Sequence, residues 1–170
     1  GPASTTCDFT FEAWVAFTGG DSDCPACIVT STQTDGDNEW YIRLDGSDYL
    51  NFHSDSLNAD LATSTAAYDT IVDNQATWHH VVGQRKATKV ELYLDGIKVA
   101  DSGTTGTGFT AGGDRDMKIG RREWSGTYTG QYWKGYMDEI AYYHGVAKYN
   151  PVATGLGTAT ITPSYLPDPT

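Results

Sequence analysis

Residues 9–17 read Phe9-Thr10-Phe11-Glu12-Ala13-Trp14-Val15-Ala16-Phe17, and hydrophobic side chains occupy every second position. Successive side chains of a strand point to opposite faces, so this alternation predicts a β-strand with one apolar face. Glu12 and Trp14 share the other face, which is more polar. The stretch therefore predicts a strand that buries one side in a hydrophobic core.

Short strand patterns continue along the chain, separated by turns rich in Gly, Asp and Asn. The clearest is a hairpin of residues 78–84 and 89–94, after which Asp95-Gly96 turns the chain again, since Gly accepts the positive φ of a tight turn. The other predicted strands are 28–32, 40–44, 49–53, 68–72, 97–100, 117–120, 136–143 and 158–162. Residues 145–149 fit one helical turn, and no stretch supports a helix of ten residues. Many short strands with close turns predict an all-β, antiparallel two-sheet sandwich.

Composition and charge exclude several classes of function. The 170 residues carry 22 acidic and 11 basic side chains, for a formal net charge of -11. Such a chain repels phosphate backbones and anionic lipids, which disfavours binding to nucleic acid or to a membrane surface. No apolar run approaches the roughly 18 residues needed to span a bilayer, so we expect no membrane insertion. The length fits one domain, and the hydrophobic fraction of 39% is sufficient for a core.

Five motifs occur in a fixed order along the chain. They are Phe11-Glu12-Ala13-Trp14-Val15, Trp78-His79-His80-Val81-Val82, Leu92-Tyr93-Leu94-Asp95-Gly96, Lys118-Ile119-Gly120 and Gly135-Tyr136-Met137-Asp138-Glu139-Ile140. In this order they resemble the laminin-G-like, concanavalin A-like jelly-roll superfamily. The continuation in residues 143–149 is similar to laminin-G-like domains of phage tail and other virion proteins, and bacterial adhesins carry related modules.

The resemblance implies two antiparallel sheets, ligand binding at rim loops or across a concave face, and frequent assistance by calcium. It does not imply a particular ligand. By the same resemblance, Trp78 belongs to the core, Trp133 packs against it, and Asp138 accepts backbone hydrogen bonds. We expect a jelly-roll domain over residues 5–150. Residues 1–4 look like the remnant of a cleaved expression tag, and the Pro/Gly/Thr-rich tail 151–170 is a candidate for an extra edge strand.

An aromatic segment before Trp133 is the strongest candidate for ligand binding. Flat aromatic rings stack on the C–H faces of sugars, while hydroxyl and amide groups hydrogen-bond to sugar hydroxyls. The expected ligand-binding residues are Trp124, Tyr128, Tyr132, Gln131, Arg121 and Arg122. The two arginines could bind a carboxylate or an acidic sugar, or could pair with local aspartates. The alternative is a loop that folds over its own aromatic side chains.

Aspartates at alternate loop positions are candidate calcium ligands. Calcium takes six to eight oxygen ligands, and closely spaced carboxylates supply several of them. The candidates are Asp21, Asp23, Asp35, Asp37, Glu39, Asp114 and Asp116. None of these loops matches the EF-hand pattern, and an acidic, solvated surface is the equally weighted alternative.

The chain has three cysteines, which are Cys7, Cys24 and Cys27. The pair Cys24 and Cys27 is weak evidence for structural zinc, which needs four ligands, because the chain has no second pair. No βαβ pattern surrounds the pair to support a thioredoxin-like motif. We expect a local disulfide between Cys24 and Cys27, with Cys7 outside the pair. Such a disulfide would indicate an oxidising, extracellular setting.

Catalysis is not the favoured hypothesis. Glycoside hydrolases of this fold place two or three carboxylates at alternate positions of one strand, and no such strand is present. The sequence instead predicts a non-catalytic module that binds a glycan or a cell-surface receptor, on a virion or on a secreted protein. A structural virion domain, which would form a homo-oligomer, is the second hypothesis, and a glycoside hydrolase is the third.

Overall fold

The computed structural model describes residues 7–19, 25–32, 40–54, 59–64, 77–102, 116–124, 127–150, 152–153 and 159–160. Within these ranges every regular element is a strand. The strands are β1 (Phe9–Phe17), β2 (Ala26–Thr32), β3 (Trp40–Leu44), β4 (Leu50–Ser54), β5 (Ala59–Thr63), β6 (His79–Lys86), β7 (Lys89–Leu94), β8 (Ile97–Asp101), β9 (Asp116–Ile119), β10 (Arg121–Trp124), β11 (Thr127–Tyr132), β12 (Gly135–His144), β13 (Val152–Ala153) and β14 (Ala159–Thr160). Nothing in the described ranges forms a helix that could cross a membrane.

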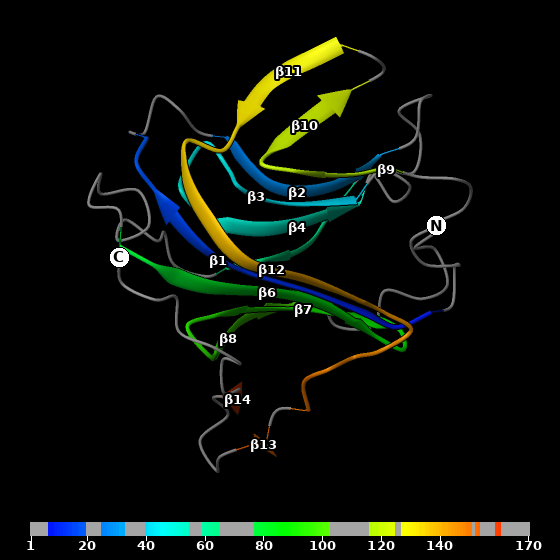
Figure 1. Ribbon diagram of the computed structural model, residues 1–170. Coiled ribbons are helices and arrows are strands. Elements are labelled where there is room, and N and C mark those ends of the chain that lie inside the picture. Colours follow the sequence, from blue (N-terminus) through cyan, green and yellow to red (C-terminus); the bar gives the residue numbers. More distant parts are fainter. Residues whose placement is uncertain are drawn as a thin grey trace.

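Two sheets form the sandwich. One has seven strands in the order β12-β1-β6-β7-β8-β14-β13, and the other has five in the order β5-β4-β3-β2-β9. Strands β10 and β11 pair only with each other, as a hairpin on the outer side of the five-stranded sheet (Figure 1). All described pairings are antiparallel, so the predicted two-sheet antiparallel sandwich is confirmed.

Aromatic stacking joins the two sheets at the core. The ring of Phe9 on β1 stacks on Trp40 of β3 with 5.0 Å between centroids, and Trp40 stacks on Phe52 of β4 at 5.5 Å. All three rings are at most 1% exposed. The alternate residues that the sequence assigned to the apolar face of β1 are all in this core, which agrees with the two-residue period of a strand.

Four expectations about local structure need correction or fall outside the described residues. The aromatic segment predicted as a loop is the β10–β11 hairpin, in which Trp124 pairs with Thr127. Residues 145–149 form no helical turn, because side chains of the seven-stranded sheet bind their backbone instead. Trp78 is half-buried against Tyr136, with 6.5 Å between ring centroids, rather than in the core. The predicted strand at residues 68–72 lies outside the described residues.

The tail contributes two short strands. Strand β13 pairs with β14, and β14 pairs with β8 through Thr160 opposite Ile97. The tail therefore extends the edge of the seven-stranded sheet.

A β-bulge interrupts the pairing of β1 with β12. Glu12 lies opposite Ala141, but Trp14 lies opposite Asp138, so two residues of β12 face one residue of β1. Glu139, inside the bulge, has φ of 49°, and its N–H donates to Asp138 Oδ1 at 2.8 Å. Asp138 thus accepts a backbone hydrogen bond, from its own neighbour. A positive φ is uncommon for a residue with a side chain, and such strain gathers at functional sites.

Candidate ligand-binding surfaces

The first candidate surface is the outer face of the five-stranded sheet, beneath the β10–β11 hairpin. On β3, Trp40, Ile42 and Leu44 belong to the core, so Tyr41 and Arg43 point outward. Antiparallel pairing places His53 opposite Tyr41 and Asn51 opposite Arg43 on the same outer face. Four side chains able to stack or hydrogen-bond are therefore neighbours on two central strands.

Cations surround the ring of Tyr41. The guanidinium carbon of Arg122 lies 4.1 Å from its centroid and that of Arg43 lies 5.0 Å away. The imidazole of His53 stacks on the same ring at 4.6 Å, and its Nδ1 lies 2.7 Å from Asp60 Oδ1. Arg122 comes from β10, so its cation–π contact ties the hairpin to the sheet. We call this group, with Asn51, the Tyr41 cluster.

Several polar atoms of this region have no protein partner. The Oδ1 and Nδ2 atoms of Asn51 and the Nε of Arg43 are buried and make no hydrogen bond with any described residue. Asn51 is fully buried. The Oε1 of Gln131, on β11 of the hairpin, is also buried and accepts no hydrogen bond from any described residue. A buried polar group left unpaired costs about 1–3 kcal/mol, so these atoms are suited to bind a polar ligand or ordered water.

The structure brings only part of the predicted ligand set to this surface. Arg122 is buried over Tyr41, Arg121 pairs with Tyr132 at the base of the hairpin, and Tyr132 is 41% exposed. Gln131 directly precedes Tyr132, in the part of β11 where the pairing register with β10 shifts. Trp124 and Tyr128 are placed only as backbone positions of the hairpin, and their side chains are outside the described part.

Sequence reasoning missed Tyr41, Arg43, Asn51 and His53. The pattern that could have found them was present, because residues 40–44 alternate between apolar side chains and Tyr41 and Arg43. Only the register of β3 against β4 shows that Asn51 and His53 join them.

The predicted calcium and disulfide sites stay predictions. Asp116 is exposed at the start of β9, opposite Thr32, and the remaining candidate ligands lie outside the described residues. The described ranges contain no group of three or more His, Cys, Asp or Glu side chains that could hold a metal. Cys27 is buried in β2 with its Sγ 3.8 Å from the carbonyl oxygen of Ile42, and Cys24 is not described.

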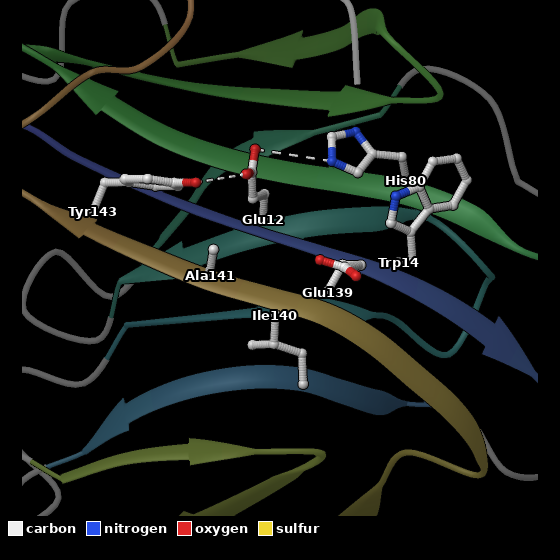
Figure 2. Close-up of a pocket in the computed structure, with 7 residues that line it drawn as sticks. All are labelled: Glu12, Trp14, His80, Glu139, Ile140, Ala141 and Tyr143. Carbon is white, nitrogen blue, oxygen red and sulfur yellow. Dashed lines mark hydrogen bonds and ion pairs between the residues drawn. The ribbon is translucent and has the colours of Figure 1, made fainter. Parts of the chain in front are cut away.

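The second candidate surface is a hollow of about 120 Å³ on the outer face of the seven-stranded sheet. It lies over the β1–β12 bulge and is lined by Glu12, Trp14, His80, Glu139, Ile140, Ala141 and Tyr143. Figure 2 shows Trp14 and Glu139 together on one side of the hollow and Glu12 with Tyr143 on another. Trp14 and His80 pair across β1 and β6, and their rings are 5.2 Å apart.

Glu12 is a buried carboxylate with a full set of donors. Lys148 Nζ lies 2.5 Å from its Oε1, Tyr143 Oη donates to the same oxygen at 3.1 Å, and Tyr149 Oη donates to Oε2. Burial raises the pKa of Glu12, but the hydrogen bonds from Lys148 and Tyr149 outweigh it, so the pKa lies below its ordinary value. The same bonds raise the pKa of Lys148 against the opposing effect of burial.

This arrangement argues against Glu12 as a catalytic acid. The acid of a glycoside hydrolase needs a raised pKa so that it keeps its proton at neutral pH. Glu12 is held ionised by a lysine and two tyrosines, and its nearest histidine, His80, is 3.9 Å away and itself buried. Glu12 therefore anchors residues 143–149 to the sheet.

With the fold described, sequence comparison assigns the family. The chain matches the family Laminin_G_3, described as the concanavalin A-like lectin/glucanases superfamily, over residues 2–151. The chain belongs to this family, as the five motifs indicated. No curated protein matches the chain.

Solved structures share the fold at low sequence identity. Domains LG4-5 of the mouse laminin alpha1 chain give a TM-score of 0.59 at 10% identity, covering 97% of this chain and 43% of that one. A SAP-like pentraxin from Limulus polyphemus gives 0.56 at 14%, covering 81% and 64%. The CBM40 of the Ruminococcus gnavus IT-sialidase gives 0.54 at 10%, covering 81% and 76%. The chain thus spans less than two thirds of the laminin and pentraxin chains. At these identities the likeness concerns the fold.

Proposed function

We propose that this chain is a non-catalytic carbohydrate-binding module that takes an anionic sugar on the Tyr41 cluster. The observation that carries the proposal is the fully buried amide of Asn51, which makes no hydrogen bond with any described residue and shares a sheet face with two guanidinium groups and an aromatic ring. An amide supplies donors and an acceptor for sugar hydroxyls, and arginine binds carboxylate or sulfate groups.

Charge supports an anionic ligand over a neutral one. The chain has twice as many acidic as basic side chains and a net charge of -11. Two of its few cationic side chains, Arg43 and Arg122, nevertheless contact one aromatic ring, that of Tyr41. Two guanidinium groups held close together attract ligands of the opposite charge. One related fold, the Ruminococcus gnavus module, has been solved bound to alpha2,3 sialyllactose, which supports the chemical class.

The setting follows from the same proposal. A module of this kind belongs on an extracellular or virion-surface protein, where it binds a glycan or a glycosylated receptor. Tyr132 of the hairpin then borders the ligand, Trp124 and Tyr128 stay candidates for stacking on it, and calcium bound by the aspartate-rich loops would assist it.

A glycan array with acidic and neutral members, with and without calcium, tests the proposal. We expect binding to sialylated, uronate or sulfated glycans and none to their neutral counterparts. Arg43→Gln should weaken that binding by about tenfold or more, since a hydrogen bond to a charged group contributes about 1.5–3 kcal/mol. Lys86→Gln, an exposed change at the end of β6, is the matched control.

Two results would overturn the proposal. Equal glycan binding by the Arg43→Gln and Lys86→Gln variants would show that the ligand does not bind at the Tyr41 cluster. A chain that binds no glycan and forms a defined oligomer in solution would instead favour a structural virion domain.

A further inference from the structure

We propose that the hollow over the β1–β12 bulge is a second binding site, specific for a small organic cation such as an alkylammonium or guanidinium group. The hollow lies on the outer face of the seven-stranded sheet, and the Tyr41 cluster lies on the outer face of the five-stranded sheet. Figure 1 shows these two sheets as opposite layers of the sandwich. The proposal is therefore independent of the proposed glycan site.

The charges around the hollow leave one carboxylate uncompensated. Glu12 is neutralised by its ion pair with Lys148 at 2.5 Å. The carboxylate of Glu139 makes no hydrogen bond or ion pair with any described residue, and Glu139 is exposed at the rim. His80 adds no positive charge near neutral pH, because its burial favours the neutral imidazole. The hollow therefore carries a net negative charge.

An aromatic surface lies beside this carboxylate. Trp14 and Glu139 both line the hollow, and Figure 2 shows them on the same side of it. A tryptophan ring attracts cations to its face through its quadrupole, and the attraction grows when water is excluded. An indole next to a carboxylate suits a group that is both positively charged and partly apolar.

The backbone keeps the hollow open. The bulge sets two residues of β12 against one residue of β1, and it holds Glu139 at a φ of 49°. The bulge breaks the regular alternation of side chains along β12, and Glu139 lines the hollow together with Trp14. Ala141 supplies only a methyl group to the wall. The volume of about 120 Å³ is room for about four water-sized groups, which is the number of non-hydrogen atoms in a guanidinium group.

Nuclear magnetic resonance titration tests the site directly. The probes are methylguanidinium, n-butylammonium and glucosamine, with urea, n-butanol and glucose as neutral counterparts. We expect saturable shifts of the Trp14 indole N–H signal, assigned with Trp14→Phe, for the cations and at least tenfold weaker effects for the neutral molecules. The ranking of butylammonium against glucosamine distinguishes a side-chain-like amine from an amino sugar.

Two variants separate binding from folding. Glu139→Gln should weaken cation binding by about tenfold, while Asp101→Asn, an exposed carboxylate change on β8 of the same sheet, should not. Glu139→Gly should abolish binding and keep or raise the melting temperature, because glycine accepts the positive φ without strain.

Other outcomes would overturn the proposal. Neutral probes that bind as well as the cations would exclude a cation site, and so would unchanged cation binding in Glu139→Gln. Arg43→Gln should leave cation binding unchanged, so failure of the glycan site and failure of this site give different results.

Discussion

Gln84 and Tyr149 hydrogen-bond to each other in both directions. The backbone N–H of Tyr149 donates to Gln84 Oε1 at 3.1 Å, and Gln84 Nε2 donates to the carbonyl oxygen of Tyr149 at 2.9 Å. The same amide also donates to Glu91 Oε2 at 2.7 Å. The Gln84 amide thereby pairs with both backbone groups of Tyr149, as the backbone of a neighbouring strand would. These bonds hold residues 146–149 on the outer face of the seven-stranded sheet.

Gln84→Leu should therefore destabilise the protein. The change leaves the buried N–H and C=O of Tyr149 and the carboxylate of Glu91 without this partner, at a cost of about 2–4 kcal/mol. Urea unfolding would show it as a lower midpoint with an unchanged slope. Lys89→Ala, at the exposed start of β7, should stay within about 0.5 kcal/mol of the parent protein. Equal midpoints for the two variants would mean that water replaces the amide without loss.

Among the glycines compared in the described residues, Gly135 is the position where a methyl group should be least tolerated. It begins β12 with φ of 149°, and a Cβ there would overlap the carbonyl oxygen of Ala16. Because the obstacle is backbone, Gly135→Ala must shift β12 away from β1, and we expect a loss of about 3 kcal/mol or more. Gly46→Ala is the matched control, since a methyl group added at Gly46 would meet no atom within 4 Å. Thermal melts of the two variants should differ by several degrees, and coincident melts would contradict the close approach.

The sequence predicted the parts of the fold that depend on local pattern. Alternation located β1, and Gly96 has the positive φ of 82° that was expected of a tight turn, while Asp95 beside it has a φ of 50°. It could not predict the attachment of residues 146–149, because Thr10 and Gln84 bind that backbone from more than 60 residues away. The helical turn inferred there was wrong for the same reason.

The candidate sites divide along the same line. Arg121, Arg122 and Gln131 were named as candidates because an aromatic, polar segment has a visible composition, and their role in binding stays a prediction. Tyr41 and Asn51 were missed because they become neighbours only through the register of β3 and β4. The bulge that aims Glu139 into the hollow depends on one extra residue in β12, which no periodicity reveals.

Calcium should stabilise the protein if the aspartate-rich loops bind it. An ion that binds only the native state raises the melting temperature as its concentration exceeds the dissociation constant. We expect a higher midpoint in millimolar calcium than in chelator, and a smaller difference for Asp35→Asn/Asp37→Asn. Magnesium at the same concentration is the control for ionic strength. An identical midpoint in calcium and chelator would leave the aspartates as a solvated acidic surface.

Acid should destabilise the protein in two steps, the first through His80. Burial lowers the pKa of His80 below its ordinary value of 6.5, and the positive charge of Lys148 lowers it further. The negative charges of Glu12 and Asp95 raise this pKa, but by less. Between the folded pKa and 6.5 the unfolded state binds more protons, so stability falls as the pH drops from about 7. Glu12, whose pKa is also lowered, contributes stability above its ordinary value of 4.5, and this is lost as the pH falls through its folded pKa.

Urea midpoints measured from pH 7.5 down to about pH 2.5 would resolve the two steps. His80→Asn should flatten the profile between about pH 7 and pH 5, because no buried imidazole remains to be protonated on unfolding. His144→Gln changes an exposed histidine at the end of β12 and should keep the slope of the parent protein. If His80→Asn and His144→Gln had the same slope as the parent, the imidazole of His80 would have to accept its proton inside the folded sheet, beside Glu12.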